Sequence, residues 1–174
     1  DALSLEGQAG RERAARGQAV STQRRRIEVI HGVNLDQLGR RGPPYPAITL
    51  AGLEQQIAAH AGELGLTTRF FHTNHEGELI ERLHSLAGPP AQADAILINP
   101  GAWTHYAWAI HDALEIPVNV GGLPALEIHL SDLASREPWR HTSVIRDLCF
   151  ATVMGRGVDG YRDALELLRE RLDA

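Results

Sequence analysis

Side chains able to do chemistry gather in the stretch LEIHLSDLASREPWRHTS, residues 126–143. His129 ends an apolar run, and Ser131 follows two residues later. Arg136 and Arg140 stand four residues apart, so one helical turn would put both guanidinium groups on the same side. Together these side chains offer a proton-transfer group, a hydroxyl and two permanent positive charges.

A carboxylate precedes the histidine by two positions. Glu127 and His129 alternate along a predicted strand, so their side chains point to one face of the sheet. A neighbouring carboxylate fixes which imidazole nitrogen carries the proton, and this makes His129 a candidate general acid. A lone histidine more often bonds only a backbone group, but the hydroxyl and the two arginines nearby favour the catalytic interpretation.

The residues after this strand could receive an anion. Backbone N–H groups of Leu130 and Ser131 lie where the strand ends, beside the Ser131 hydroxyl. The alternative for Ser131 is the N-cap of a following helix, and this is compatible with anion binding. For Arg136 and Arg140 the alternative is ordinary solvated charge.

A tyrosine at the end of the loop GRRGPPY, residues 39–45, could act as a base. Its phenol is a poor base at neutral pH, but a close guanidinium favours the phenolate. Arg41 lies four residues before Tyr45 and could provide that charge.

The stretch INPGAWTH, residues 98–105, supplies two more polar groups. Asn99 stands at a predicted strand end, where its amide could bond a polarised carbonyl or a water bound to it. His105 stands near a predicted helix start, where capping or packing is the alternative role.

Composition excludes several classes of function. The 174 residues contain 17 Lys+Arg, and all 17 are arginine, so no lysine side chain can form a Schiff base or serve a Walker-type phosphate site. The net charge of -5 gives no support for nucleic-acid binding, and no apolar run is long enough for a membrane span. A single cysteine, Cys149, and an N-terminal segment without a signal-like apolar region lead us to expect a cytoplasmic protein.

Two motifs invite other functions but lack the required context. GRGVDG, residues 155–160, has the G-x-G-x-x-G spelling, but it lies at the last strand and helix, and we interpret it as strand–helix packing. The nine histidines show no metal-ligand spacing, so we predict no metal site.

Alternating strand and helix patterns place these groups in space. Strands are predicted at 26–31, 66–73, 94–99, 123–131 and 148–155, and helices at 50–65, 76–88, 105–115 and 157–172. This alternation predicts a flavodoxin-like α/β three-layer sandwich with a five-stranded parallel sheet of order 2-1-3-4-5. Residues 26–174 would form one catalytic domain, and 1–25 a flexible or partly helical extension. In such sheets ligands bind beyond the carboxyl ends of the strands, where the polar loops converge.

Five ordered motifs resemble the type II 3-dehydroquinate dehydratases over about residues 27–172. They are GVNLDQLGRR…Y, NHEGELIERLH, INPGAWTH, LEIHLSDLASREPWRHTS and the closing G…GY..AL. The resemblance implies loss of water from 3-dehydroquinate, giving 3-dehydroshikimate by anti elimination through an enolate. It also implies no cofactor, and a homo-oligomer assembled as a dodecamer of trimers.

The resemblance assigns the proton-abstraction side of the site. Tyr45 would remove a C2 proton, with Arg41 lowering the phenol's pKa. Asn34 would hold the lid loop and the proton-abstraction site, and Asn99 would position a water on the enolate oxygen.

The remaining roles implied by the resemblance concern the acid and the substrate. His129, oriented by Glu127, would protonate the leaving C1 hydroxyl. The expected substrate-binding groups are the Leu130 amide and Ser131 for the carboxylate, His105 and Arg140 for ring hydroxyls, Arg136 as a lid-facing arginine, and Asp112 as an acid reaching a neighbouring subunit's site.

The chain departs from the family pattern near the lid. His31-Gly32-Val33 stands where Asn-Gly-Pro is usual, Asp132 stands for an asparagine, and Gly42 replaces a glutamate in a loop one residue shorter. Three hypotheses therefore stay open: an active dehydratase, a relative acting on a modified cyclohexane carboxylic acid, and a catalytically silent ligand-binding assembly protein.

Overall fold

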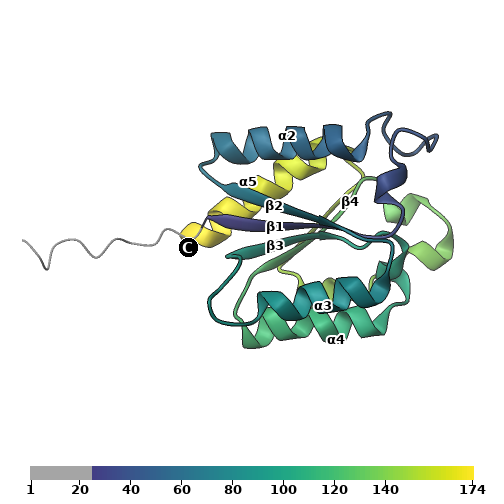
Figure 1. The fold of residues 1–174 in the computed structure, drawn as a ribbon. Helices are drawn as coiled ribbons and strands as arrows, with labels where there is room; N and C mark the ends of the chain where they lie inside the picture. The colour runs from purple at the N-terminus through teal and green to yellow at the C-terminus, as the bar shows by residue number, and fades with distance from the viewer. Residues whose placement is uncertain (1–24) are drawn as a thin grey trace, which may run out of the picture.

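The computed structural model describes residues 25–174, in which five parallel strands form one sheet between two layers of helices (Figure 1). The strands are β1 (Arg26–His31), β2 (Thr67–His72), β3 (Ala95–Asn99), β4 (Ala125–His129) and β5 (Ala151–Met154). They are hydrogen-bonded in the order β2-β1-β3-β4-β5. The predicted flavodoxin-like architecture and strand order are confirmed.

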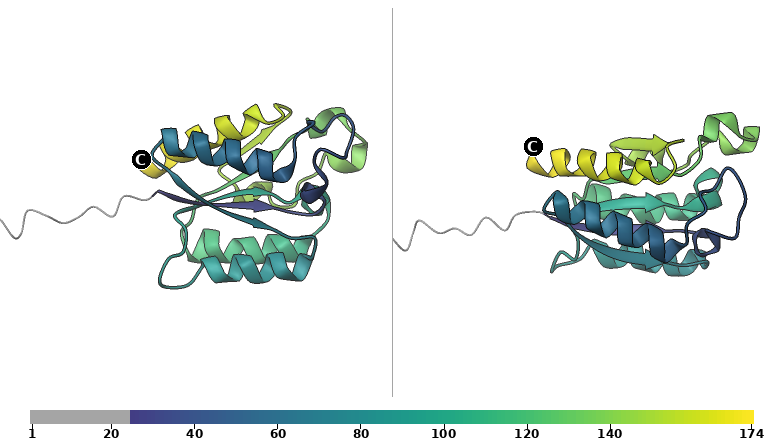
Figure 2. Two further views of the ribbon diagram at one scale, coloured as in Figure 1. Left: turned by 45° about the horizontal axis from the view of Figure 1, so that its top comes forward. Right: turned by 90° about the horizontal axis from the view of Figure 1, so that it is seen from above.

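Two helices cover each face of the sheet (Figure 2). Helices α2 (Leu50–Glu63) and α5 (Asp159–Asp173) pack on one face, and α3 (Glu76–Leu86) and α4 (Trp108–Glu115) on the other. The strands are buried on both sides because apolar side chains alternate between the two layers. In β1, for example, Val29 packs under α2 and α5, whereas Ile30 packs on α3 and α4.

Short helical turns shape the loops that leave the strands. They are η2 (Leu35–Gln37), η3 (Gly101–His105), η4 (Ile116–Val120), η5 (Leu133–Ser135), η6 (Pro138–Arg140) and η7 (Arg146–Leu148). All are 3-10 turns except η4, which is a π turn. Four of them, η2, η3, η5 and η6, lie beyond the carboxyl ends of β1, β3 and β4, so they form the rim that the sequence predicted.

Local capping signals define the two ends of α2. The Thr49 hydroxyl accepts a hydrogen bond from the Gly52 N–H at 3.1 Å, which satisfies one of the free donors of the first turn. The helix ends at Glu63, and Gly65 then adopts a left-handed φ of 68°.

The structure corrects several element ends. The predicted helix over 105–115 is split, because Gly101–His105 forms a separate turn and α4 begins only at Trp108. The fourth and fifth strands are shorter than predicted: Leu123, Leu148 and Cys149 pack on the core from outside the strands.

The predicted extension over residues 1–25 lies, apart from Arg25, outside the described residues. The assignment of 26–174 as a single catalytic domain stays a prediction. From residue 25 onward, no helix has both the length and the apolar run that crossing a membrane requires.

Candidate active site

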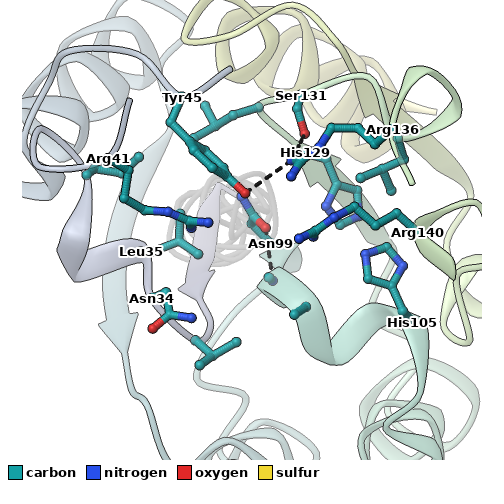
Figure 3. A pocket seen from close by; sticks show the side chains of 16 residues that line it. Asn34, Leu35, Arg41, Tyr45, Asn99, His105, His129, Ser131, Arg136 and Arg140 are labelled. Carbon is teal, nitrogen blue, oxygen red and sulfur yellow. Dashed lines mark hydrogen bonds between the residues drawn. The ribbon is translucent and has the colours of Figure 1, made fainter. Parts of the chain in front are cut away.

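A pocket opens beyond the carboxyl ends of β1, β3 and β4 (Figure 3). Ten of the predicted site residues line it: Asn34, Arg41, Tyr45, Asn99, His105, His129, Leu130, Ser131, Arg136 and Arg140. The rest of the lining is apolar or small: Val33, Leu35, Leu38, Gly101, Ala102 and Leu133. Residues from the three connections after β1, β3 and β4 therefore meet at the rim, as expected for an open parallel sheet.

Two arginines act on the Tyr45 phenol. The Arg136 guanidinium donates a hydrogen bond to Tyr45 Oη at 3.1 Å, and the Arg41 guanidinium carbon lies 3.7 Å from the ring centroid. Partial burial by itself raises the pKa of Tyr45, but the Arg136 hydrogen bond and the charges of Arg41, Arg136 and Arg140 outweigh it, and the pKa is lowered. The site therefore favours a phenolate at this position.

Sequence reasoning paired Tyr45 with Arg41 alone. Arg136 is 91 residues away in the chain, so no local spacing could show this contact. The same guanidinium also donates to Ser131 Oγ at 3.1 Å, and it thus links the tyrosine loop to the end of β4.

His129 is held by the predicted carboxylate. Its Nε2 lies 2.7 Å from Glu127 Oε1, and both side chains are buried. This contact leaves Nδ1 as the ring nitrogen available to a molecule in the pocket. Glu127 does not line the pocket itself, because it lies behind the imidazole.

Glu127 has two further partners that the sequence analysis missed. Thr104 Oγ1 lies 2.5 Å from its Oε1, and Ser143 Oγ lies 2.8 Å from each of its carboxylate oxygens. Burial raises the pKa of Glu127, but the hydrogen bonds from His129, Thr104 and Ser143 lower it by more than burial raises it. The pKa of Glu127 therefore falls below its ordinary value. The only sequence signal was a hydroxyl residue in each of the motifs WTH and HTS.

The loop after β4 differs from the expected helical turn. Asp132, rather than Ser131, caps η5 by accepting the Ala134 N–H at 3.0 Å. Arg136 and Arg140 do not share one helix, because η5 ends at Ser135 and η6 begins at Pro138. Both guanidinium groups nevertheless line the pocket.

His105 and Arg140 form one wall of the pocket. His105 Nδ1 lies 2.8 Å from the Thr142 carbonyl, and its ring stacks on that of His129 with centroids 6.5 Å apart. Burial and the nearby His129 and Arg140 lower the pKa of His105. The Arg140 guanidinium lies over Trp139, 4.0 Å from the ring centroid, and bonds Glu137 at 2.9 Å.

The two asparagines stand at the carboxyl ends of neighbouring strands, Asn99 as the last residue of β3 and Asn34 in the loop after β1. Asn99 Oδ1 accepts the Gly101 N–H at 3.1 Å, which fixes the amide at the end of β3. Asn34 has a left-handed backbone with φ of 67°, and its N–H bonds Asn74 Oδ1 at 2.8 Å. This strained conformation directs the loop after β1 around the pocket.

Asp112 is the predicted site residue that stays away from the pocket. Its side chain is 82% exposed on α4 and contacts His111 at 3.3 Å. Over residues 25–174 no group of three or more His, Cys, Asp or Glu side chains is arranged to hold a metal.

Comparison with known proteins gives a consistent family. The model of the family "Dehydroquinase class II" matches residues 25–169. The chain is 45% identical over 136 residues to 3-dehydroquinate dehydratase of Leptothrix cholodnii, covering 78% of this chain and 87% of that protein. It is also 45% identical over 141 residues to Catabolic 3-dehydroquinase 1 of Aspergillus terreus, covering 80% and 88%.

A solved structure of a type II dehydroquinase is also similar to this chain. The type II dehydroquinase from Butyrivibrio crossotus is 34% identical, with a TM-score of 0.76 over 83% of this chain and 97% of that one. The chain therefore belongs to the class II dehydroquinase family.

Proposed function

We propose that this protein removes water from 3-dehydroquinate to give 3-dehydroshikimate, acting as a hydro-lyase. The observation that carries the proposal is one pocket that holds both a base and an acid. Its base is a tyrosine whose pKa is lowered by arginines, and its acid is a histidine held by a buried carboxylate.

The first step removes a proton from C2. The Tyr45 phenolate takes this proton, and the electron pair of the C–H bond moves to the C3 carbonyl oxygen to form an enolate. Arg41 and Arg136 stabilise the phenolate before the transfer. Asn34 holds the lid loop beside this site, and Asn99 holds a water that stabilises the enolate oxygen.

The second step expels the C1 hydroxyl. The enolate electrons form the C1–C2 double bond, the C1–O bond breaks, and His129 Nδ1 gives its proton to the departing oxygen, so that water leaves. Glu127 stabilises the imidazolium before this transfer. The Leu130 N–H and Ser131 bind the substrate carboxylate, and His105 and Arg140 bind ring hydroxyls. Arg136 faces the lid.

Every proton transfer in this scheme uses a side chain of the protein, so the proposal needs no cofactor. Its other parts are a cytoplasmic location and an assembly of trimers into a dodecamer, in which Asp112 reaches a neighbouring subunit's site. Exposure of Tyr106 (60%) and Trp108 (63%) around α4 supports a subunit contact there.

The direct test follows the absorbance of the conjugated enone after 3-dehydroquinate is added. We expect turnover by the wild type and by His84→Asn, a control at an exposed histidine of α3. His129→Ala should lose nearly all turnover. Absence of signal from the wild type at high enzyme concentration would overturn the proposal.

A further inference from the structure

Two hydroxyl side chains, those of Thr104 and Ser143, bond Glu127, the carboxylate that also contacts His129. We propose that Thr104 and Ser143 are positioning residues that keep the shared proton on His129 instead of on Glu127. The kinetic consequence of this inference rests on the proposed function, whereas the location of the proton does not.

The two hydroxyls lie within hydrogen-bond distance of the Glu127 carboxylate. Thr104 Oγ1 lies 2.5 Å from Glu127 Oε1, and Ser143 Oγ lies 2.8 Å from both carboxylate oxygens. Each hydroxyl has a single proton to donate. The two hydroxyl oxygens are 3.0 Å apart, so one hydroxyl can donate to the other only by withdrawing its proton from Glu127.

The two hydroxyls are fixed by the backbone. Thr104 is fully buried in η3, and its carbonyl accepts the Val144 N–H at 2.7 Å. The adjacent His105 bonds the Thr142 carbonyl at 2.8 Å. These two bonds join η3 to the segment that carries Ser143, so both donors are held in place on Glu127.

A proton between Glu127 and His129 has two possible positions. Along the 2.7 Å contact it lies either on the imidazole, leaving a carboxylate, or on the carboxyl, leaving a neutral ring. A buried carboxylate is costly unless donors satisfy its oxygens, and here two hydroxyls do so. They thus favour the ion pair, in which the ring remains able to give up its Nδ1 proton to a leaving hydroxyl.

The other titratable groups around the pair do not replace this role. Burial together with the Glu127 charge raises the pKa of Cys149, so that thiol stays neutral near pH 7. The charged or titratable side chains that line the pocket with His129 are His105 on η3, Arg136 after η5, Arg140 on η6, and Arg41 and Tyr45 from the lid loop; Glu137 bonds Arg140.

The test compares Thr104→Val/Ser143→Ala with the conservative Thr104→Ser and Ser143→Thr variants. A matched control, Thr67→Val/Ser85→Ala, makes the same chemical changes on β2 and α3, outside the pocket. Ser143→Ala alone, which removes one donor with little change in volume, serves if the double variant fails to fold.

We expect kcat of the double variant to fall by about 10- to 100-fold, while KM changes by less than about 3-fold. The alkaline limb of its kcat–pH profile should stay in place or move to higher pH. When the pair formed by Glu127 and His129 loses its shared proton, it leaves a Glu127 carboxylate without its hydroxyl donors, so the pair holds that proton at least as tightly as in the wild type. The conservative variants should recover most of the activity. A kcat within about 2-fold of the wild type would overturn the inference.

The location of the proton is measured directly by 15N NMR of labelled histidine without substrate, with His129→Asn used to assign the signal. At acidic pH we expect both ring nitrogens to be protonated in the wild type, and Nε2 to lose its proton in the double variant. Identical spectra would overturn the inference. If the wild type does not turn over 3-dehydroquinate, the proposed function fails. The NMR result alone then still decides whether Thr104 and Ser143 keep the proton on His129.

Discussion

At Tyr45 a single phenol receives positive charge from two directions. Arg136 approaches the oxygen along a hydrogen bond, and Arg41 covers the ring face. The ion pair that a phenolate would form with either guanidinium is strongest where water is partly excluded, and Tyr45 is half-buried. The proposed base therefore depends on loop positions far apart in the sequence.

Arg41→Ala should move the acid-side limb of the kcat–pH profile to higher pH. Arg41 lowers the pKa of Tyr45, so its loss raises that pKa, and the phenolate then forms only at higher pH. Arg40→Ala is the matched control, since Arg40 is exposed and does not line the pocket. Equal shifts in both variants, or none in either, would contradict the role of Arg41.

His31 gives a second pH dependence, in stability. Its ring is fully buried, and burial together with the nearby His72 lowers its pKa to about 3. Between pH 6.5 and 3 the unfolded chain binds a proton that the folded chain excludes, so the free energy of unfolding falls as pH falls through this window. From pH 7 to pH 5 this loss is about 2 kcal/mol.

Urea unfolding at pH 7 and pH 5 measures how much of the acid-dependent loss of stability comes from His31. In His31→Asn, the drop in unfolding free energy between the two pH values should be smaller than in the wild type by about 2 kcal/mol. His84→Asn, at an exposed position, should keep the wild-type drop. A His31 variant with an unchanged drop would show that the buried ring does not control acid stability.

The sequence predicted which residues line the pocket better than it predicted the contacts that each of them makes. His129 and Glu127 were paired correctly because alternation along a strand is a local rule. The bonds from Thr104 and Ser143 to Glu127 join residues 23 and 16 positions away, and only the fold brings them together. Asp132 as the cap of η5 was missed because Ser131 is an equally good capping residue type.

Among the elements, the loops after β1 and β3 are in direct contact. Gly32 N–H donates to the Asn99 carbonyl at 2.7 Å, and Gly101, with φ of 65°, packs on the Val33 carbonyl. This contact sets the spacing between the loop that carries Asn34 and the strand end that carries Asn99.

Gly32→Ala should therefore destabilise the protein and reduce kcat. An added Cβ would lie 2.2 Å from the Pro100 carbonyl oxygen, a backbone atom that cannot move without displacing the loop. We expect a loss of about 1–3 kcal/mol in unfolding free energy, measured by urea denaturation.

Gly77→Ala is the matched control for this change. Gly77 lies in α3 with nothing within 4 Å of its added Cβ, and alanine favours the helix, so stability should rise slightly with kcat unchanged. If Gly32→Ala behaved like this control, the contact between the two loops would not matter.

Element order was predictable because strand and helix periods alternate clearly along the chain, and right-handed crossovers allow few arrangements. Element ends were harder. Residues 123–124 and 148–150 look like strand, but Leu123, Leu148 and Cys149 pack on the core from outside β4 and β5, and Phe150 is exposed. Propensity alone does not show where inter-strand hydrogen bonding stops.

At the scale of the whole molecule, the exposed aromatic side chains near α4 suggest assembly. We expect sedimentation at micromolar concentration to give a large oligomer, and Trp108→Asp to give smaller species, because it places a charge in an apolar contact. Leu167→Asp, on α5 on the opposite side of the sheet, should leave the oligomer intact. A monomeric wild type would contradict both the trimer-based assembly and the role of Asp112 between subunits.

The central claim is that Tyr45 removes the C2 proton while His129 expels the hydroxyl, in separate steps. Exchange of the substrate's C2 proton, followed by 1H NMR of 3-dehydroquinate in D2O, tests it most directly. His129→Ala should exchange one C2 proton without forming product, and Tyr45→Phe should do neither. Exchange by Tyr45→Phe, with none by His129→Ala, would contradict the account.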